Sequence, residues 1–234
     1  MSKQSVLFIL TSADKLLNGA PTGWYLPEAA HPYYALHNDF NIDVASPLGG
    51  EAPLDQNSVQ MFKDEESVKF LSDPQAQKLV KNTKKISEVK AADYAAIFVV
   101  GGHGPCIDLA SAKEFAQLAQ DVSKLSGPLA AVCHGPVAYT ITTKPNSTES
   151  VLNGVEATVF TNAEEAQTPY NDFVNILPFS PEDKLKELGA KFVKADEPWG
   201  VKVVWDGGIL TGQNPASAGP LGQKLKEILL SQSA

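Results

Sequence analysis

Short, almost wholly apolar segments alternate with helix-forming segments along most of this chain. The clearest apolar segments are Val6–Leu10, Ala95–Val100 and Pro128–Val132. Strands that are apolar at nearly every position are buried on both faces, as in a parallel sheet covered by helices on either side. The pattern therefore predicts an α/β fold with one doubly wound, mostly parallel sheet.

The remaining elements continue this alternation. The sequence predicts further helices at Gly23–Phe40, Ala112–Leu125, Pro181–Leu188 and Gly219–Leu230. It also predicts strands at Asn41–Ser46, Glu156–Phe160 and Lys191–Lys194, and a hairpin that pairs Val201–Trp205 with Ile209–Thr211. Segment 51–90 is polar, has weak helical patterns around Ser67–Leu71 and Pro74–Lys81, and is expected to be a surface insertion. No repeat or long linker divides the sequence, so we expect residues 1–234 to form a single domain.

Charge and hydropathy exclude several classes of protein. The net charge is -8 and no basic cluster occurs, which argues against nucleic acid as a partner. No apolar segment approaches the roughly 20 residues that cross a membrane, and Ser5–Leu10 is interpreted as a core strand rather than a signal peptide. Two cysteines do not form a disulfide framework, so a reducing cytoplasmic location is expected.

One of the apolar strands ends abruptly at a cysteine. Cys133 is followed by His134 and then by Gly135-Pro136, which permits a sharp turn into a helix that is expected to begin near Val137. This is the pattern of a nucleophile elbow, in which a strained turn lifts one side chain out of the sheet. A cysteine at the positive end of the following helix dipole would favour the thiolate form. Cys133 is therefore the candidate nucleophile.

Two further groups follow other strands of the predicted sheet. Ligands of doubly wound sheets bind outside the carboxyl ends of the strands, so these groups are expected near Cys133. Gly101 and Gly102 would either direct backbone amides toward an oxyanion or simply form a tight turn with positive φ. Glu28, beyond the first strand, is either a solvated residue on a helix face or a buried acid whose pKa a neighbouring thiolate would raise.

His134 needs a partner from elsewhere in the chain. Because it directly follows Cys133, its ring is not expected to turn back easily onto the sulfur, and a distant carboxylate would have to orient it. Glu164 and Glu165 are the candidates.

Cys106 is interpreted as a small buried hydrophobe, with a redox-sensitive thiol as the alternative. The histidines do not have metal-ligand spacing alongside either cysteine, so no metal and no cofactor are expected.

Several of these motifs together resemble the ThiJ/PfpI superfamily: Ala131–Pro136, Gly101–Gly104 and Glu28–Pro32. Phe160–Glu165 and Thr211–Ala218 resemble more narrowly its glutathione-independent glyoxalase (glyoxalase III) branch, which is also described as a heat-shock chaperone branch. The resemblance implies a flavodoxin-like sandwich with Cys133 as nucleophile. It places the family's acidic residue at Glu28 and its elbow histidine at His134, with Glu165 preferred to Glu164 as the carboxylate that orients the histidine.

The implied activity is the conversion of methylglyoxal to lactate without glutathione or a cofactor, a lyase reaction of the D-lactate dehydratase class. Cys133 would form a hemithioacetal whose oxyanion the Gly101 and Gly102 amides hold. The substrate would be a small 2-oxoaldehyde. The alternatives are a stress-response holdase chaperone that binds unfolded clients, a cysteine hydrolase or deglycase of the same fold, and an oxidation sensor. Relatives often form dimers, so a homodimer is a further expectation.

Overall fold

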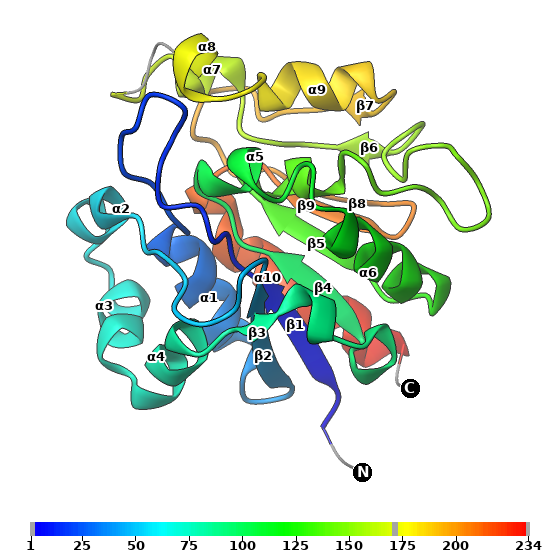
Figure 1. The fold of residues 1–234 in the computed structure, drawn as a ribbon, viewed down its shortest axis with the longest axis horizontal. Coiled ribbons are helices and arrows are strands. Elements are labelled where there is room, and N and C mark those ends of the chain that lie inside the picture. The colour runs from blue at the N-terminus through cyan, green and yellow to red at the C-terminus, as the bar shows by residue number, and fades with distance from the viewer. Residues whose placement is uncertain (1–2, 170–172, 233–234) are drawn as a thin grey trace.

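The computed structural model describes residues 3–169 and 173–232, and a seven-stranded sheet forms the centre of this part of the chain (Figure 1). The strand order is β3-β2-β1-β4-β5-β9-β8. Their bounds are β1 Ser5–Ile9, β2 Asn41–Ser46, β3 Lys84–Lys85, β4 Ala96–Val99, β5 Leu129–Val132, β8 Val203–Asp206 and β9 Ile209–Gly212. All neighbours are parallel except β8 and β9, which form the predicted hairpin. The prediction of a doubly wound, mostly parallel sheet is confirmed.

Helices cover both faces of the sheet, as the apolar strands require. Helices α1 (Leu26–Leu36) and α10 (Ala218–Gln232) pack on one face, and α6 (Lys113–Lys124) packs on the other (Figure 1). Alternate residues of β1 separate the two layers: Phe8 belongs to the cluster with α1 and α10, whereas Leu7 and Ile9 belong to the cluster with α6. Helix α1 is shorter than the predicted Gly23–Phe40: its N-cap Tyr25 has extended backbone, and the chain leaves the helix after Leu36, with His37 as the C-cap.

Segment 51–90 contributes more than a surface insertion. It forms α2 (Gln56–Met61), α3 (Glu65–Ser72) and α4 (Pro74–Lys81), supplies the edge strand β3, and ends after the short 3-10 helix η1 (Ile86–Glu88). A second 3-10 helix, η2 (Ala91–Asp93), follows it. Phe70 and Val80 lie in the same buried cluster as Val44 of β2. Helices α2, α3, α4 and η1 each bury only one or two residues, and these few buried positions lie among polar and charged neighbours in the sequence.

The region after β5 departs most from the predicted strands. Strand β6 covers only Glu156–Ala157 and pairs with β7 (Lys191–Phe192) in a separate two-stranded sheet. Residues 158–160 turn away from β7 toward β5, where the Phe160 amide donates to the Cys133 carbonyl at 2.9 Å. The remaining elements are α5 (Gly104–Ile107), η3 (Gly135–Tyr139), α7 (Asn162–Glu165), α8 (Phe173–Ile176), α9 (Pro181–Glu187) and η4 (Pro215–Ser217). No helix in the described ranges is long and apolar enough to cross a bilayer.

Candidate active site

Cys133 occupies the strained turn that the sequence predicts. It follows β5 directly and has a φ of 60°, a left-handed conformation that is rare for a residue with a side chain. Its amide donates to the Gly212 carbonyl of β9 at 2.8 Å, which fixes the turn to the neighbouring strand. The turn leads into η3, a 3-10 helix of five residues, rather than into a longer α-helix. The predicted helix dipole is therefore a weak source of thiolate stabilisation.

The burial of the sulfur favours its protonated form. Burial raises the pKa of the Cys133 thiol well above its ordinary value. Burial therefore favours the thiol at rest and opposes the thiolate that the helix dipole was expected to favour. Ionisation of the thiol requires a base in contact with it or the approach of a substrate.

The thiol lies in a cavity of about 330 Å³ at the carboxyl end of β5. This volume is within the range of small-molecule binding sites. The cavity wall combines aromatic, amide and acidic side chains from both halves of the chain. Its lining residues are Tyr25, Asp55, Asn57, Gln60, Met61, Phe62, Gly102, His103, Cys133, His134, Phe160, Gln167, Thr168, Pro169, Trp199 and Pro215.

His134 turns back onto the sulfur, contrary to the expectation from its position in the sequence. Its Nδ1 lies 3.2 Å from Cys133 Sγ, and its Nε2 lies 2.7 Å from Glu165 Oε2. Burial lowers the pKa of His134, and the neighbouring His103 lowers it further, so the ring is neutral at pH 7. An ionised carboxylate only accepts hydrogen bonds, so Nε2 carries the proton and Nδ1 presents a lone pair to the thiol. His134 is therefore placed as a base for Cys133.

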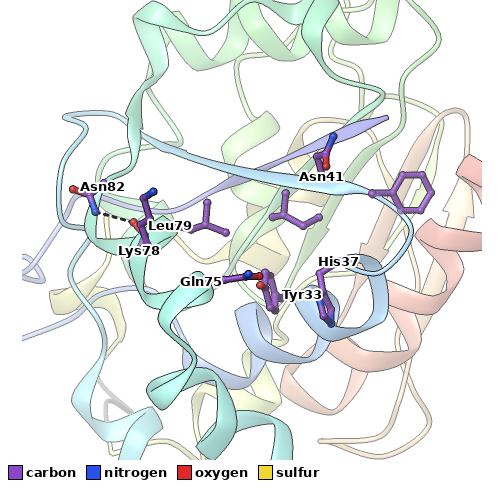
Figure 2. A pocket seen from close by; sticks show the side chains of 9 residues that line it. Tyr33, His37, Asn41, Gln75, Lys78, Leu79 and Asn82 are labelled. Atoms are coloured by element: carbon purple, nitrogen blue, oxygen red, sulfur yellow. Dashed lines mark hydrogen bonds between the residues drawn. The ribbon is translucent and has the colours of Figure 1, made fainter. Parts of the chain in front are cut away.

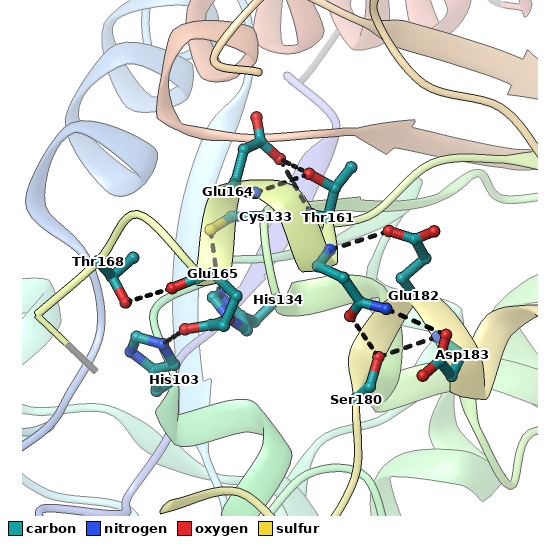
Figure 3. A network of polar contacts seen from close by, with 11 residues as sticks. His103, Cys133, His134, Thr161, Glu164, Glu165, Thr168, Ser180, Glu182 and Asp183 are labelled. Atoms are coloured by element: carbon teal, nitrogen blue, oxygen red, sulfur yellow. Dashed lines mark hydrogen bonds and ion pairs between the residues drawn. The ribbon is translucent and has the colours of Figure 1, made fainter. Parts of the chain in front are cut away.

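Glu165, not Glu164, is the carboxylate in contact with this histidine (Figure 3). Burial favours the neutral form of Glu165, but the two adjacent histidines outweigh it and hold its pKa well below the ordinary value. Glu164 serves a different purpose. Its side chain forms a capping box with Thr161 and accepts hydrogen bonds from Gln213 and Asn214 at 2.9 and 2.8 Å. Glu164 thus ties α7 to the end of β9 and holds Glu165 in position.

His103 is the site residue to which the sequence reasoning gave no role. Its Nε2 lies 2.6 Å from Glu165 Oε1, so one carboxylate holds two histidines whose rings are 4.3 Å apart (Figure 3). The sequence feature that could have indicated a role for His103 is its position in Gly101–Gly104, directly after the two glycines. Among the described residues, His103, His134 and Glu165 have ligand atoms close enough to share a metal ion. In this structure both Nε2 atoms are instead committed to hydrogen bonds with the carboxylate.

Glu28 lies in the first turn of α1 and is fully buried, so the solvated-surface interpretation is wrong. Burial raises the pKa of Glu28 well above its ordinary value, and the Cys133 thiol and the amides of Gly101 and Gly102 offset only part of this rise. Neither carboxyl oxygen has a hydrogen bond of ordinary geometry among the described residues. Burial therefore favours the neutral form of Glu28, which can donate one proton toward the sulfur.

The two glycines after β4 have different surroundings. A Cβ atom on Gly101 would lie 2.3 Å from Glu28 Oε2, so this position is a glycine because the acid occupies the space. Gly102 has a φ of 92° and lines the cavity, and its amide favours the charged form of Cys133. Of these two amides, that of Gly102 lies beside both the sulfur and the cavity. The Gly101 amide faces Glu28 instead.

Cys106 is separate from this cavity wall. Its side chain is 2% exposed and belongs to the buried cluster around α6. Burial raises the pKa of the Cys106 thiol well above its ordinary value, and Glu165 contributes to the rise. The structure is consistent with the interpretation of Cys106 as a small buried hydrophobe.

A second hollow of about 380 Å³ lies between α1, β2 and α4 (Figure 2). Tyr33, His37, Gln75 and Lys78 are among the side chains around it. The ring of His37 stacks on Tyr33 with 4.9 Å between the ring centroids. Among the described residues that line this hollow there is no cysteine, aspartate or glutamate. The cavity above Cys133 is the candidate active site.

Comparison with known proteins agrees with this choice. The model of the DJ-1/PfpI family matches residues 23–175, which include Glu28, Cys133, His134 and Glu165. The glutathione-independent glyoxalase HSP31 of Saccharomyces cerevisiae is 30% identical over 93% of this chain and 94% of its own length. The protein/nucleic acid deglycase HchA of Escherichia coli is also 30% identical, over 97% of this chain and 79% of its own length.

A solved structure extends the similarity to three dimensions. The crystal structure of glyoxalase III from Candida albicans superposes with a TM-score of 0.86 at 29% sequence identity. The superposition covers 96% of each chain. The similarity therefore includes the sheet and the loops that carry the candidate site.

Proposed function

Because the chain belongs to the DJ-1/PfpI family, we propose that it is a glutathione-independent glyoxalase that converts methylglyoxal and water into lactate. The observation that carries the proposal is the contact chain from Cys133 Sγ to His134 Nδ1 and from His134 Nε2 to Glu165 Oε2, at 3.2 and 2.7 Å. It joins a nucleophile, a base and an orienting anion in one buried line. The relatives named as glyoxalases support the same activity.

The first step is the addition of sulfur to the aldehyde carbon. His134 Nδ1 takes the thiol proton as the Sγ–C1 bond forms, and Glu165 stabilises the imidazolium. The electron pair of the carbonyl bond moves to the aldehyde oxygen, where the Gly102 amide donates a hydrogen bond. His134 then returns its proton to this oxygen. The product is a neutral hemithioacetal on Cys133.

The second step moves hydrogen between the two former carbonyl carbons. Neutral His134 takes the proton from C1 while the neutral acid Glu28 protonates the C2 oxygen, which gives an enediol. The imidazolium then delivers its proton to C2, and the C1 hydroxyl returns a proton to the Glu28 carboxylate. The result is a lactoyl thioester with both residues restored. Two groups with opposite proton occupancy at pH 7 are what this exchange requires.

Hydrolysis of the thioester completes the cycle. His134 takes a proton from water as the water oxygen attacks the thioester carbon, and the departing sulfur receives that proton. The overall reaction consumes one water molecule and needs no redox partner. It is a lyase reaction of the D-lactate dehydratase class.

The test is lactate formation from methylglyoxal in a buffer free of thiols and amines. We expect turnover by the wild-type protein, none by Cys133→Ala, and nearly full turnover by Cys106→Ser. Lactate formation by Cys133→Ala at the wild-type rate would refute the covalent mechanism. Cys106→Ser is the control for loss of a thiol because Cys106 does not line the cavity.

Deglycation is the second candidate, and the similarity to HchA supports it. The discriminating substrate is methylglyoxal pre-reacted with N-acetyl-arginine. Lactate released faster than free methylglyoxal dissociates from this adduct would favour a deglycase; release limited by dissociation would favour the glyoxalase. The name of HchA includes nucleic acid. The expectation, based on net charge, that this chain does not bind nucleic acid therefore stays a prediction. The holdase activity and the homodimer also stay predictions.

Location is part of the same proposal. Both cysteines are free and buried, as expected for a protein of a reducing compartment. We therefore keep the cytoplasm as the proposed location.

A further inference from the structure

We propose that this cavity selects neutral 2-oxoaldehydes with an aromatic or similarly bulky apolar substituent over methylglyoxal. The inference rests on the proposed glyoxalase function and deepens it. Its first support is size. At about 30 Å³ for a water molecule in the liquid, a cavity of about 330 Å³ holds roughly ten water-sized groups. A three-carbon oxoaldehyde on Cys133 therefore fills less than half of the cavity and leaves its outer part empty.

The second support is the aromatic wall of this outer part. Tyr25 and Phe62 form an edge-to-face pair with ring centroids 5.6 Å apart, and Phe160 and Trp199 form another at 5.4 Å. Met61 also lines the cavity, with 67% of its surface exposed. Exposed apolar side chains that gather at one cavity mark a binding surface. A planar ring on the substrate can stack on or meet the edges of these aromatic rings.

Trp199 is held in position before any substrate binds. Its φ is 66°, a left-handed conformation that neighbouring groups must maintain. Its amide donates to Glu164 Oε1 at 2.9 Å, and its indole Nε1 donates to Gln167 Oε1 at 2.8 Å. The rotation of a large, 41% exposed side chain is thereby restricted. A wall arranged in advance binds a rigid apolar group at a smaller entropic cost.

The charges around the cavity exclude anionic substituents. Asp55 lines the wall and is only 5% exposed. No lysine or arginine occurs among the described lining residues. His103 and His134 are engaged with Glu165. A carboxylate on the substrate would lose its hydration without gaining a cationic partner, so the preferred substituent is neutral.

The experiment compares kcat/KM for methylglyoxal, phenylglyoxal and 4-carboxyphenylglyoxal in the wild-type protein and three variants. Phe62→Leu and Trp199→Ala each remove one aromatic wall, and Trp205→Ala is the matched control. Trp205 is 39% exposed, similar to Trp199, but does not line the cavity. Because the aldehydes differ in intrinsic reactivity, the criterion is the ratio of phenylglyoxal to methylglyoxal activity, compared between proteins.

We expect phenylglyoxal to be the best of the three substrates. The phenylglyoxal-to-methylglyoxal ratio should fall about tenfold in Phe62→Leu and in Trp199→Ala, the scale of one lost aromatic contact with its burial. Trp205→Ala should leave the ratio unchanged. The inference is overturned if both wall variants keep the wild-type ratio, or if the carboxylated substrate is turned over as well as phenylglyoxal. Failure of the proposed function looks different, since the wild-type protein would then convert none of the three aldehydes.

Discussion

Replacing Glu165 with glutamine tests the central contact of the proposed mechanism. The carboxylate accepts N–H groups from two histidines, His134 at 2.7 Å and His103 at 2.6 Å. A glutamine side chain offers one carbonyl oxygen and one NH2 group at the same two places. It can therefore accept from only one histidine, and the other must present a lone pair to the amide nitrogen.

The size of the fall in kcat depends on which of the two histidines changes its tautomer. If His134 does, its Nδ1 carries the proton toward Cys133 and cannot act as a base. The corresponding wrong-tautomer substitution in serine proteases lowers kcat by about 10⁴. If His103 changes, His134 keeps its tautomer but loses the anion that stabilises its imidazolium, which costs about 1–2 kcal/mol, or roughly tenfold in rate. The expected fall in kcat for Glu165→Gln lies between these limits, about 10 to about 10⁴.

The assay is the initial rate of lactate formation from methylglyoxal, with circular dichroism as the test of folding. Glu182→Gln is the matched control. Glu182 is also a buried glutamate, 8% exposed, and accepts from the Asn162 amide at 2.9 Å without contacting either histidine. It should keep kcat within about twofold. A folded Glu165→Gln protein that loses less than threefold in kcat would refute the assigned roles of Glu165 and His134.

Three further predictions concern the groups around the sulfur. Below pH 4.5 the raised pKa of Glu28 has no effect on stability, but above it the unfolded chain loses a proton that the folded chain keeps. In urea titrations Glu28→Gln should therefore gain stability over wild type by up to about 1.4 kcal/mol per pH unit above 4.5, and a pH-independent difference would contradict this. Gly101→Ala places a Cβ 2.3 Å from Glu28 Oε2 and should lower the unfolding free energy by about 1–3 kcal/mol; an unchanged urea midpoint would show that the acid moves freely. Iodoacetamide should label Cys133, which lines the cavity, before Cys106; peptide mass mapping that finds Cys106 labelled first would reverse this order.

The sequence determined the sheet, the elbow and the identity of most candidate residues. Uninterrupted apolar strands have only one stable environment, between two layers of helices, so their pattern is sufficient to predict the fold class. Cys133 was predictable because a strand that ends in a polar residue and Gly-Pro leaves few alternatives for the chain. Segment 51–90 was harder to predict, since Phe70 and Val80 are single buried positions on short charged helices.

Only the tertiary structure decided the electrostatics of the site. Adjacent residues in a sequence do not reveal whether their side chains meet, and the left-handed turn at Cys133 is what brings the His134 ring to 3.2 Å from the sulfur. The choice of Glu165 over Glu164, and the part played by His103, depend on segments 31 to 62 residues apart that meet above the sheet. The protonation of Glu28 depends on complete burial, which is a property of the packed core and not of the residues next to it in the chain.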